Sequence, residues 1–227
     1  MAEYSKPDRW SLKAQKEGYP ARSVYKLKEM DEKFGLIKNG LIKGARSPFR
    51  VLDLGAAPGS WSLYVLRKLP LKADALKVSA LETSGVKLPE PVLVSVDLAP
   101  LSRQYDEGFF DRPDFLFIQG DFTSGVIQET VVSHGPYNLV VSDAAPSTTG
   151  NRSVDTLRSL DLAETALHYA ETILAKGGNL AIKVFQGGDT GKLLKAIRGL
   201  FETGKSFKPQ ACRAESFETY YLGLGKK

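Results

Sequence analysis

The sequence predicts an α/β protein built on a mostly parallel sheet with helices on both faces. Short apolar runs, each ending in an acidic or small residue, alternate with stretches of helical periodicity along the 227 residues. The final segment reads as a hairpin, which indicates an antiparallel pair at the end of the sheet. A chain of this length supports one main core, and none of its apolar runs is long enough to span a membrane.

The predicted elements follow from where the apolar periodicity changes. Strands are expected at 50–54, 91–96, 115–118, 138–141 and 179–185, and a hairpin within 207–223 completes a seven-stranded sheet. Helices are expected at 21–34, 59–69, 123–133, 154–175 and 192–201. A turn is expected at 43–48. Residues 70–91 have little periodicity, so they are predicted to form a surface insertion.

Positive charge is concentrated near the N-terminus. Residues 1–50 contain 12 Lys and Arg against 6 Asp and Glu, whereas the whole chain has a net charge of +5, which leaves residues 51–227 with a net charge of −1. Aromatic residues such as Trp10 and Tyr19 alternate with these cations, as in proteins that bind single-stranded nucleic acid, although a solvated leading helix would have the same composition. We therefore expect residues 1–45 to form a basic arm and helix for a polyanion, ahead of the main domain at 46–227.

Cysteine and histidine are scarce. One cysteine, Cys212, cannot form an internal disulfide, and two histidines with one cysteine argue against a structural zinc site. No metal is therefore expected, and the cysteine usage favours a reducing cytoplasm.

A glycine loop follows the first strand of the main domain. A dinucleotide-binding turn requires Gly-x-Gly-x-x-Gly, in which the second glycine lets the backbone approach a pyrophosphate. The loop here runs from Gly55 to Gly59 with two glycines, and Pro58 removes a backbone donor where a phosphate would need one. The loop therefore disfavours a nicotinamide-dependent oxidoreductase, which is the first alternative on this fold.

Four aspartates occur at the ends of predicted parallel strands: Asp53, Asp97, Asp121 and Asp143. Because the carboxyl ends of such strands meet at one crevice, these carboxylates are expected to surround one ligand. A crevice of this charge repels a pyrophosphate and suits a cofactor with a cationic amino-acid end, a ribose and an adenine, which describes S-adenosylmethionine. Asp97 is placed to accept the ribose hydroxyls.

With these residues laid out, residues 8–225 resemble the FtsJ/RrmJ (RlmE-like) family of S-adenosylmethionine-dependent RNA ribose 2′-O-methyltransferases. Five motifs carry the resemblance in the family's order: KAQKEGY with ARSVYKL at 13–27, DLGAAPGSWS at 53–62, SDAAP at 142–146, IKVFQG at 182–187, and Glu218 before Tyr220. The resemblance implies a Rossmann-like class I methyltransferase fold with S-adenosylmethionine as its cofactor. Two departures are Ser60, where bacterial members often have glycine, and the length of the insertion at 70–91.

The resemblance also implies a catalytic set and a donor-binding set. The catalytic set falls on Lys26, Asp143, Lys183 and Glu218, with Lys183 as the expected base for a ribose hydroxyl and Asp143 orienting its amine. The donor-binding residues are expected to be Asp53, Gly55, Ala57, Pro58, Gly59, Ser60, Trp61, Asp97, Leu98, Asp121, Phe122 and Asp143.

The expected substrate is a ribose in RNA, within large-subunit ribosomal RNA and on a uridine. A tRNA anticodon loop is the alternative substrate, and a non-catalytic RNA-binding protein is the alternative function. The chain is expected to act as a cytoplasmic monomer without a membrane partner.

Overall fold

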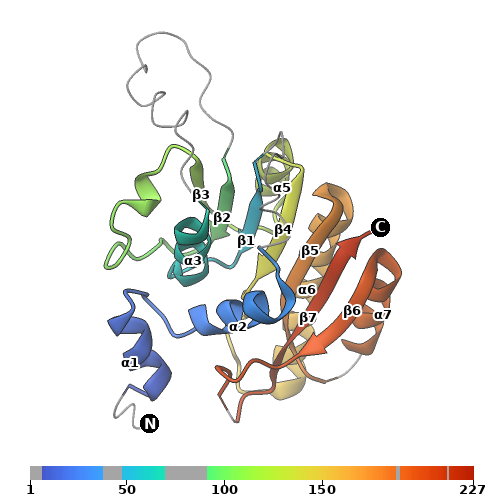
Figure 1. Cartoon of the computed structure of the whole chain (residues 1–227). Coiled ribbons are helices and arrows are strands. Elements are labelled where there is room, and N and C mark those ends of the chain that lie inside the picture. The colour runs from blue at the N-terminus through green and yellow to red at the C-terminus, as the bar shows by residue number, and fades with distance from the viewer. Residues whose placement is uncertain (1–6, 38–47, 70–90, 188–189, 214) are drawn as a thin grey trace.

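The structure is a computed structural model that describes residues 7–37, 48–69, 91–187, 190–213 and 215–227. The turn expected at 43–48 and the insertion expected at 70–91 lie outside these residues, apart from Pro48 and Pro91. Seven strands form one sheet in the order β3-β2-β1-β4-β5-β7-β6 (Figure 1). The predicted seven-stranded α/β architecture is therefore confirmed.

The elements have the following bounds. The strands are β1 (Val51–Leu54), β2 (Leu93–Asp97), β3 (Phe115–Gln119), β4 (Tyr137–Ser142), β5 (Leu174–Phe185), β6 (Phe201–Phe207) and β7 (Glu218–Lys226). The helices are α1 (Arg9–Lys16), α2 (Val24–Phe34), α3 (Ser60–Lys68), α5 (Gly125–Ser133), α6 (Arg152–Ile173) and α7 (Thr190–Leu200), with a short 3₁₀ turn, η2, at Phe109–Asp111.

The strand order creates a crevice at the centre of the sheet. Strands β3, β2, β1, β4 and β5 pair in parallel, whereas β7 pairs antiparallel with both β5 and β6. From β1 the chain proceeds to β2 and β3 on one side, and from β4 to β5 on the other. Connections that diverge in this way leave the carboxyl ends of β1 and β4 open to a ligand.

Each face of the sheet carries its own core, because side chains alternate along a strand. Val51, Leu93 and Val141 pack on the face covered by α2 and α3. Their neighbours Leu52, Val94 and Val140 pack on the opposite face, against α5, α6 and α7. No helix among the described residues is long and apolar enough to cross a membrane.

The predicted position of the terminal hairpin is wrong. Its strands are β6 and β7, with Phe201 opposite Lys226 and Phe207 opposite Tyr220, so the hairpin starts earlier and ends later than 207–223. The segment 201–207 contains Gly204 and two charged residues, Glu202 and Lys205, which are typical of a helix end and a turn. Pairing with β7 and complete burial of Phe201 override that local preference. Similarly, β5 begins at Leu174 rather than at 179.

Helix α2 is joined to α3 by the buried carboxylate of Asp31. Val24, Leu27 and Met30 form the buried face of this helix, which ends at Phe34 and is capped by Gly35, whose φ of 66° suits glycine. One oxygen of Asp31 accepts the Ile37 N–H at 2.8 Å, and the other accepts the Tyr64 hydroxyl at 2.8 Å and pairs with Lys68 of α3. The Asp31 carboxylate therefore holds the backbone that follows α2 and two side chains of α3 in place.

We predict that Asp31→Ala lowers the free energy of unfolding by about 3 kcal/mol, because it leaves a buried N–H and a buried hydroxyl without an acceptor. Urea unfolding measures the change. Glu32→Ala, at the adjacent exposed position, is the matched control and is expected to stay within about 0.5 kcal/mol of the unaltered protein. Equal stability of the two variants would contradict this role of Asp31.

Candidate active site

The loop after β1 approaches two other segments too closely for side chains. Gly55 has a φ of 75°, and a Cβ there would lie 2.6 Å from Ala144 in the segment after β4. Gly59 has a φ of 104°, and its Cβ would lie 2.8 Å from the ring of Phe110. Glycine is required at both positions, because other residues would meet steric conflict and backbone strain together. The loop therefore brings its backbone directly against the crevice.

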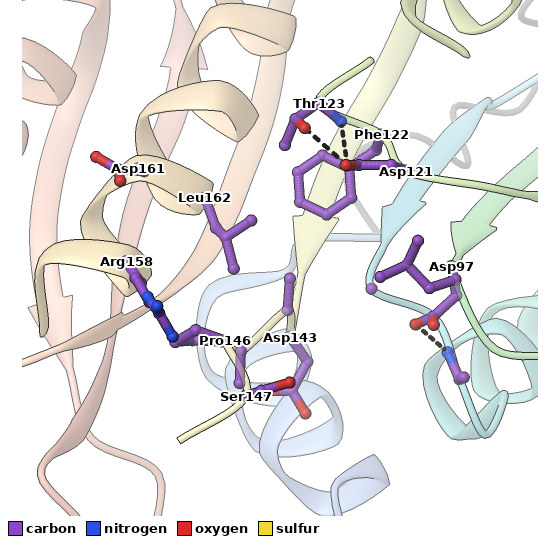
Figure 2. A pocket seen from close by; sticks show the side chains of 15 residues that line it. Asp97, Asp121, Phe122, Thr123, Asp143, Pro146, Ser147, Arg158, Asp161 and Leu162 are labelled. Carbon is purple, nitrogen blue, oxygen red and sulfur yellow. Dashed lines mark hydrogen bonds between the residues drawn. The ribbon is translucent and has the colours of Figure 1, made fainter. Parts of the chain in front are cut away.

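A cavity of about 590 Å³ lies at the carboxyl ends of β1 to β4 (Figure 2). Asp97 lies on one side of it, and Arg158 and Leu162 of α6 lie on the opposite side. Its wall consists of Gly55, Ala57, Asp97, Leu98, Asp121, Phe122, Thr123, Asp143, Ala144, Ala145, Pro146, Ser147, Arg158, Asp161 and Leu162.

Backbone N–H groups hold two of the carboxylates in this wall. Asp97 accepts the N–H of Ala57 at 2.9 Å with one oxygen and the N–H of Ala99 at 2.8 Å with the other. One oxygen of Asp121 accepts both the N–H and the hydroxyl of Thr123 at 2.8 Å. Each carboxylate has lone-pair sites left over, on both oxygens of Asp97 and on the second oxygen of Asp121, so both groups present fixed acceptors to the cavity.

These residues fit S-adenosylmethionine. The fixed carboxylates offer acceptors for ribose hydroxyls and an adenine amine, and their charge favours a cationic ligand. Phe122 and Leu98 supply apolar surface on the same wall, and Leu98 is 72% exposed, so its side chain is available to contact a ligand. Gly55 and Ala144 both line the cavity, and because Gly55 has no side chain, its backbone is exposed to a ligand there.

Five of the residues expected to bind the donor do not line this cavity. Asp53 lies beneath it, fully buried, and Pro58 and Gly59 lie on the side of the loop that faces Ser102 and Phe110. Ser60 and Trp61 are the first residues of α3, and their side chains face the segment that leads into α2. Ser60 bonds to both the N–H and the carbonyl of Ala21, and the Trp61 indole donates to the Ser23 carbonyl at 2.8 Å.

Asp53 is a buried carboxyl group with one satisfied oxygen. Ser62 donates to that oxygen at 2.7 Å, and the other oxygen is buried without a hydrogen-bond partner in the structure. Burial, aided by the charges of Asp143 and Asp97, raises the pKa of Asp53 to about 7, against the lowering effect of the Ser62 hydrogen bond. Asp53 therefore holds its proton across much of the acidic range.

The four residues of the expected catalytic set lie together beside the cavity. Lys26 is 2.9 Å from Glu218 and 3.8 Å from Asp143, and Lys183 is 3.1 Å from Asp143. Helix α2 supplies Lys26, the ends of β4 and β5 supply Asp143 and Lys183, and β7 supplies Glu218. The sequence suggests that Lys26, considered alone, is a solvated helix residue, but it is buried with a side-chain partner.

The protonation states within this cluster follow from its contacts. Burial alone would lower the pKa of Lys26, but the nearby carboxylates of Asp143 and Glu218 outweigh it and raise that pKa above its usual value. Burial would raise the pKa of Asp143, but Lys183, Lys26 and the Tyr220 hydroxyl lower it below the usual range. Near neutral pH, Lys26 is therefore an ammonium and Asp143 a carboxylate.

Several residues lie at this site although the sequence predicts no role for them. Tyr220 donates its hydroxyl to Asp143 at 2.5 Å, and the only local signal for it was its place two residues after Glu218 on one strand face. Arg158, Asp161 and Leu162 reach the cavity from the middle of α6. Nothing in the local sequence distinguishes them from other positions of an amphipathic helix. Within the described residues, no group of three His, Cys, Asp or Glu side chains could hold a metal ion.

The sheet order, the glycine loop and the acidic residue that ends β2 define the class I methyltransferase fold. Solved structures share it. A ribosomal RNA methyltransferase from Plasmodium falciparum has a TM-score of 0.64 at 23% identity, over 92% of this chain and 98% of its own. Human methyltransferase-like protein 13, in complex with SAH, has a TM-score of 0.53 at 14% identity, over 87% of this chain and 80% of its own.

The family follows from sequence similarity over the whole chain. The model of the FtsJ-like methyltransferase family matches residues 19–226. Ribosomal RNA large subunit methyltransferase E of Treponema denticola is 48% identical over 227 residues, which cover 99% of this chain and 97% of that protein. The chain belongs to the FtsJ-like methyltransferase family, and its methyl donor is S-adenosylmethionine.

We predict that Asp97→Ala weakens the binding of S-adenosylmethionine by about 10- to 100-fold, because hydrogen bonds to a charged acceptor are worth about 1.5 to 3 kcal/mol. Isothermal titration calorimetry measures the affinity. Asp111→Ala, an exposed aspartate on η2, is the control and is expected to bind normally. Unchanged affinity of the Asp97 variant would contradict its assignment to the donor.

We predict that Asp53→Asn alters how stability depends on pH. Between the unfolded pKa of about 4 and the folded pKa of about 7, the folded state keeps a proton that the unfolded state has lost, so this group lowers stability as pH rises. Asparagine cannot ionise, so the variant should gain melting temperature relative to the unaltered protein as pH rises through that window. A difference that stays constant with pH would contradict the raised pKa.

Proposed function

We propose that the chain transfers a methyl group to the 2′-hydroxyl of a ribose in large-subunit ribosomal RNA. The observation that carries this proposal is the cluster of Lys26, Asp143, Lys183 and Glu218 next to the cavity that fits the donor. The name of the Treponema denticola relative, ribosomal RNA large subunit methyltransferase E, supports the substrate class. A uridine is the nucleotide we favour.

Asp143 links the donor cavity to the catalytic cluster. It lines the cavity, and it also contacts the amines of Lys183 and Lys26. When bound, S-adenosylmethionine supplies a methyl group that its sulfonium has already activated. The chain therefore has to hold the ribose in line with that methyl and to remove the hydroxyl proton, and positioning alone supplies much of the acceleration.

The two lysines have different roles in this proposal. Lys26 pairs with two carboxylates and has a raised pKa, so it stays charged and holds the acceptor hydroxyl or a neighbouring phosphate. Lys183 contacts one carboxylate and is the group that accepts the hydroxyl proton. Glu218 holds Lys26, and Asp143 holds Lys183, so each amine has a defined position.

The N-terminal arm is proposed to bind the RNA backbone. Its described part begins with α1, on which Arg9, Lys13 and Lys16 are exposed. Asp8 caps this helix by accepting the N–H groups of Trp10 and Ser11, which leaves those cations on a formed helix rather than a coil. Cations on a rigid element can follow phosphates with less loss of conformational entropy.

A tRNA anticodon loop is the less favoured substrate, because the relative with 48% identity is named for the large ribosomal subunit. The non-catalytic alternative is also disfavoured, because all four residues of the cluster are present and in contact.

One chain supplies the whole cluster, so we propose that a monomer acts, in the cytoplasm where ribosomal subunits are available.

Labelled S-adenosylmethionine, incubated with the protein and either large ribosomal subunits or total tRNA, tests the substrate. We expect label in large-subunit RNA, at a nucleotide that resists alkaline cleavage because its ribose is 2′-O-methylated. Label confined to tRNA, or to a base, would overturn the proposal.

We predict that Lys183→Ala lowers kcat by about 10²- to 10⁴-fold while the affinity for S-adenosylmethionine stays the same, because only the proton acceptor is lost. Single-turnover methylation of large subunits gives the rate, and calorimetry gives the affinity. Lys183→Arg puts a guanidinium, which cannot accept a proton, next to Asp143, so it should be as slow as the alanine variant. An active arginine variant would exclude Lys183 as the base.

A further inference from the structure

We propose that Phe217 and Arg152 hold the base of the nucleotide that is methylated, with Phe185 as the support beneath them. This inference rests on the proposed function and extends it, because it assigns a site to the base rather than to the ribose. None of the three residues lines the donor cavity or belongs to the catalytic cluster.

The three side chains pack against one another in series, with the two rings edge to face, and this series is called the stack. The ring of Phe217 meets the ring of Phe185 at a centroid separation of 4.6 Å and an interplanar angle of 61°. The guanidinium carbon of Arg152 lies 5.1 Å from the centroid of Phe217. Phe185 is buried, Phe217 is half-buried and Arg152 is exposed, so the stack rises from the core to the surface. An aromatic face and a guanidinium plane are the two protein surfaces on which unpaired bases stack.

The position of the stack relative to Lys183 follows from strand geometry. Phe185 comes two residues after Lys183 on β5, so the two side chains lie on the same sheet face, about 7 Å apart along the strand. Phe185 is also paired with Glu218, and Phe217 directly precedes Glu218. The stack therefore continues from the catalytic cluster along the carboxyl end of β5.

Two elements of the site anchor the stack. The Phe217 carbonyl accepts the N–H of Gln186 at 2.8 Å, which ties the residue before Glu218 to the end of β5. Arg152 is the first residue of α6, whose start is capped by Asn151. The same connection from β4 carries Pro146 and Ser147, which line the donor cavity. Phe217 and Arg152 thus come from the acceptor side and the donor side of the site.

The base of the methylated nucleotide needs a surface on which to stack, because it loses its stacking partners in the RNA. A nucleotide that leaves its neighbours in the RNA to bring its 2′-hydroxyl to the buried Lys183 loses base stacking, which costs a few kcal/mol. Stacking on a protein ring returns about 1 to 3 kcal/mol per base. A base that enters between Phe217 and Arg152 requires the exposed guanidinium to move outward, while Phe185 keeps the ring in place. Because every base has an aromatic face, this stack holds the base without selecting it.

Methylation of large ribosomal subunits that lack the modification tests the proposal. We expect Phe217→Ala to lower kcat/KM for the subunits by about 5- to 150-fold, the equivalent of one lost stacking contact. We expect Phe217→Tyr to retain activity, since tyrosine keeps the ring, and Arg152→Ala to lower kcat/KM in the same direction as Phe217→Ala. The affinity for S-adenosylmethionine and the melting temperature should stay the same in all three variants.

The matched control is Phe109→Ala. Phe109 is also half-buried and also has an arginine above its ring, Arg67 at 5.9 Å, but it lies on η2 between β2 and β3. We expect this variant to methylate subunits at the unaltered rate. An equal loss in the Phe109 and Phe217 variants, or no loss in the Phe217 variant, would overturn the base site.

Ultraviolet cross-linking of the unaltered enzyme to the subunits gives a second measurement that does not depend on any variant. We expect the peptide that contains Phe217 to carry the methylated nucleotide, as identified by mass spectrometry. A cross-link of that nucleotide to another segment only would overturn the inference. Absence of methyl transfer by the unaltered enzyme, in contrast, would overturn the proposed function and with it this inference.

Discussion

The arrangement of this site depends on one shared carboxylate. Asp143 accepts the Tyr220 hydroxyl, pairs with Lys183 and Lys26, and at the same time forms part of the donor cavity. It can do so because β4 ends at the topological switch point, where the connections to its neighbours diverge and leave its carboxyl end uncovered. A carboxylate elsewhere on the sheet would meet either the donor or the lysines, but not both.

Two buried lysines, one buried carboxylate and one half-buried carboxylate form a group whose charges balance. Removing a single charge from such a cluster leaves its partner uncompensated, whereas the complete set offsets much of its own desolvation. The net effect at Lys26 is a raised pKa, although burial alone would lower it. The two carboxylates that Lys26 contacts therefore keep its amine charged although the side chain is buried.

The sequence pattern predicts the sheet and the helices on its faces, and the resemblance to the family predicts the cluster of Lys26, Asp143, Lys183 and Glu218. Buried parallel strands are recognised in the sequence as short apolar runs. The aspartates at their ends indicate the position of the crevice, because the carboxyl ends of parallel strands lie at one edge of the sheet. The location of β6 is not predictable from local pattern, since pairing with β7 imposes extended structure on a segment with weak preference. Likewise, Arg158 and Leu162 enter the cavity from mid-helix positions, and only the packing of α6 on the sheet decides which of its residues face the ligand.

The loop from Gly55 to Trp61 contacts the donor cavity on one face and the segment before α2 on the other. Gly55 and Ala57 face the donor cavity, whereas Ser60 and Trp61 clasp the residues that lead into α2, the helix that carries Lys26. A substitution at Ser60 is therefore expected to change the placement of Lys26 without touching the wall of the donor cavity. Substitutions a few residues apart in one motif can thus alter either the cavity or the position of that lysine without altering the other.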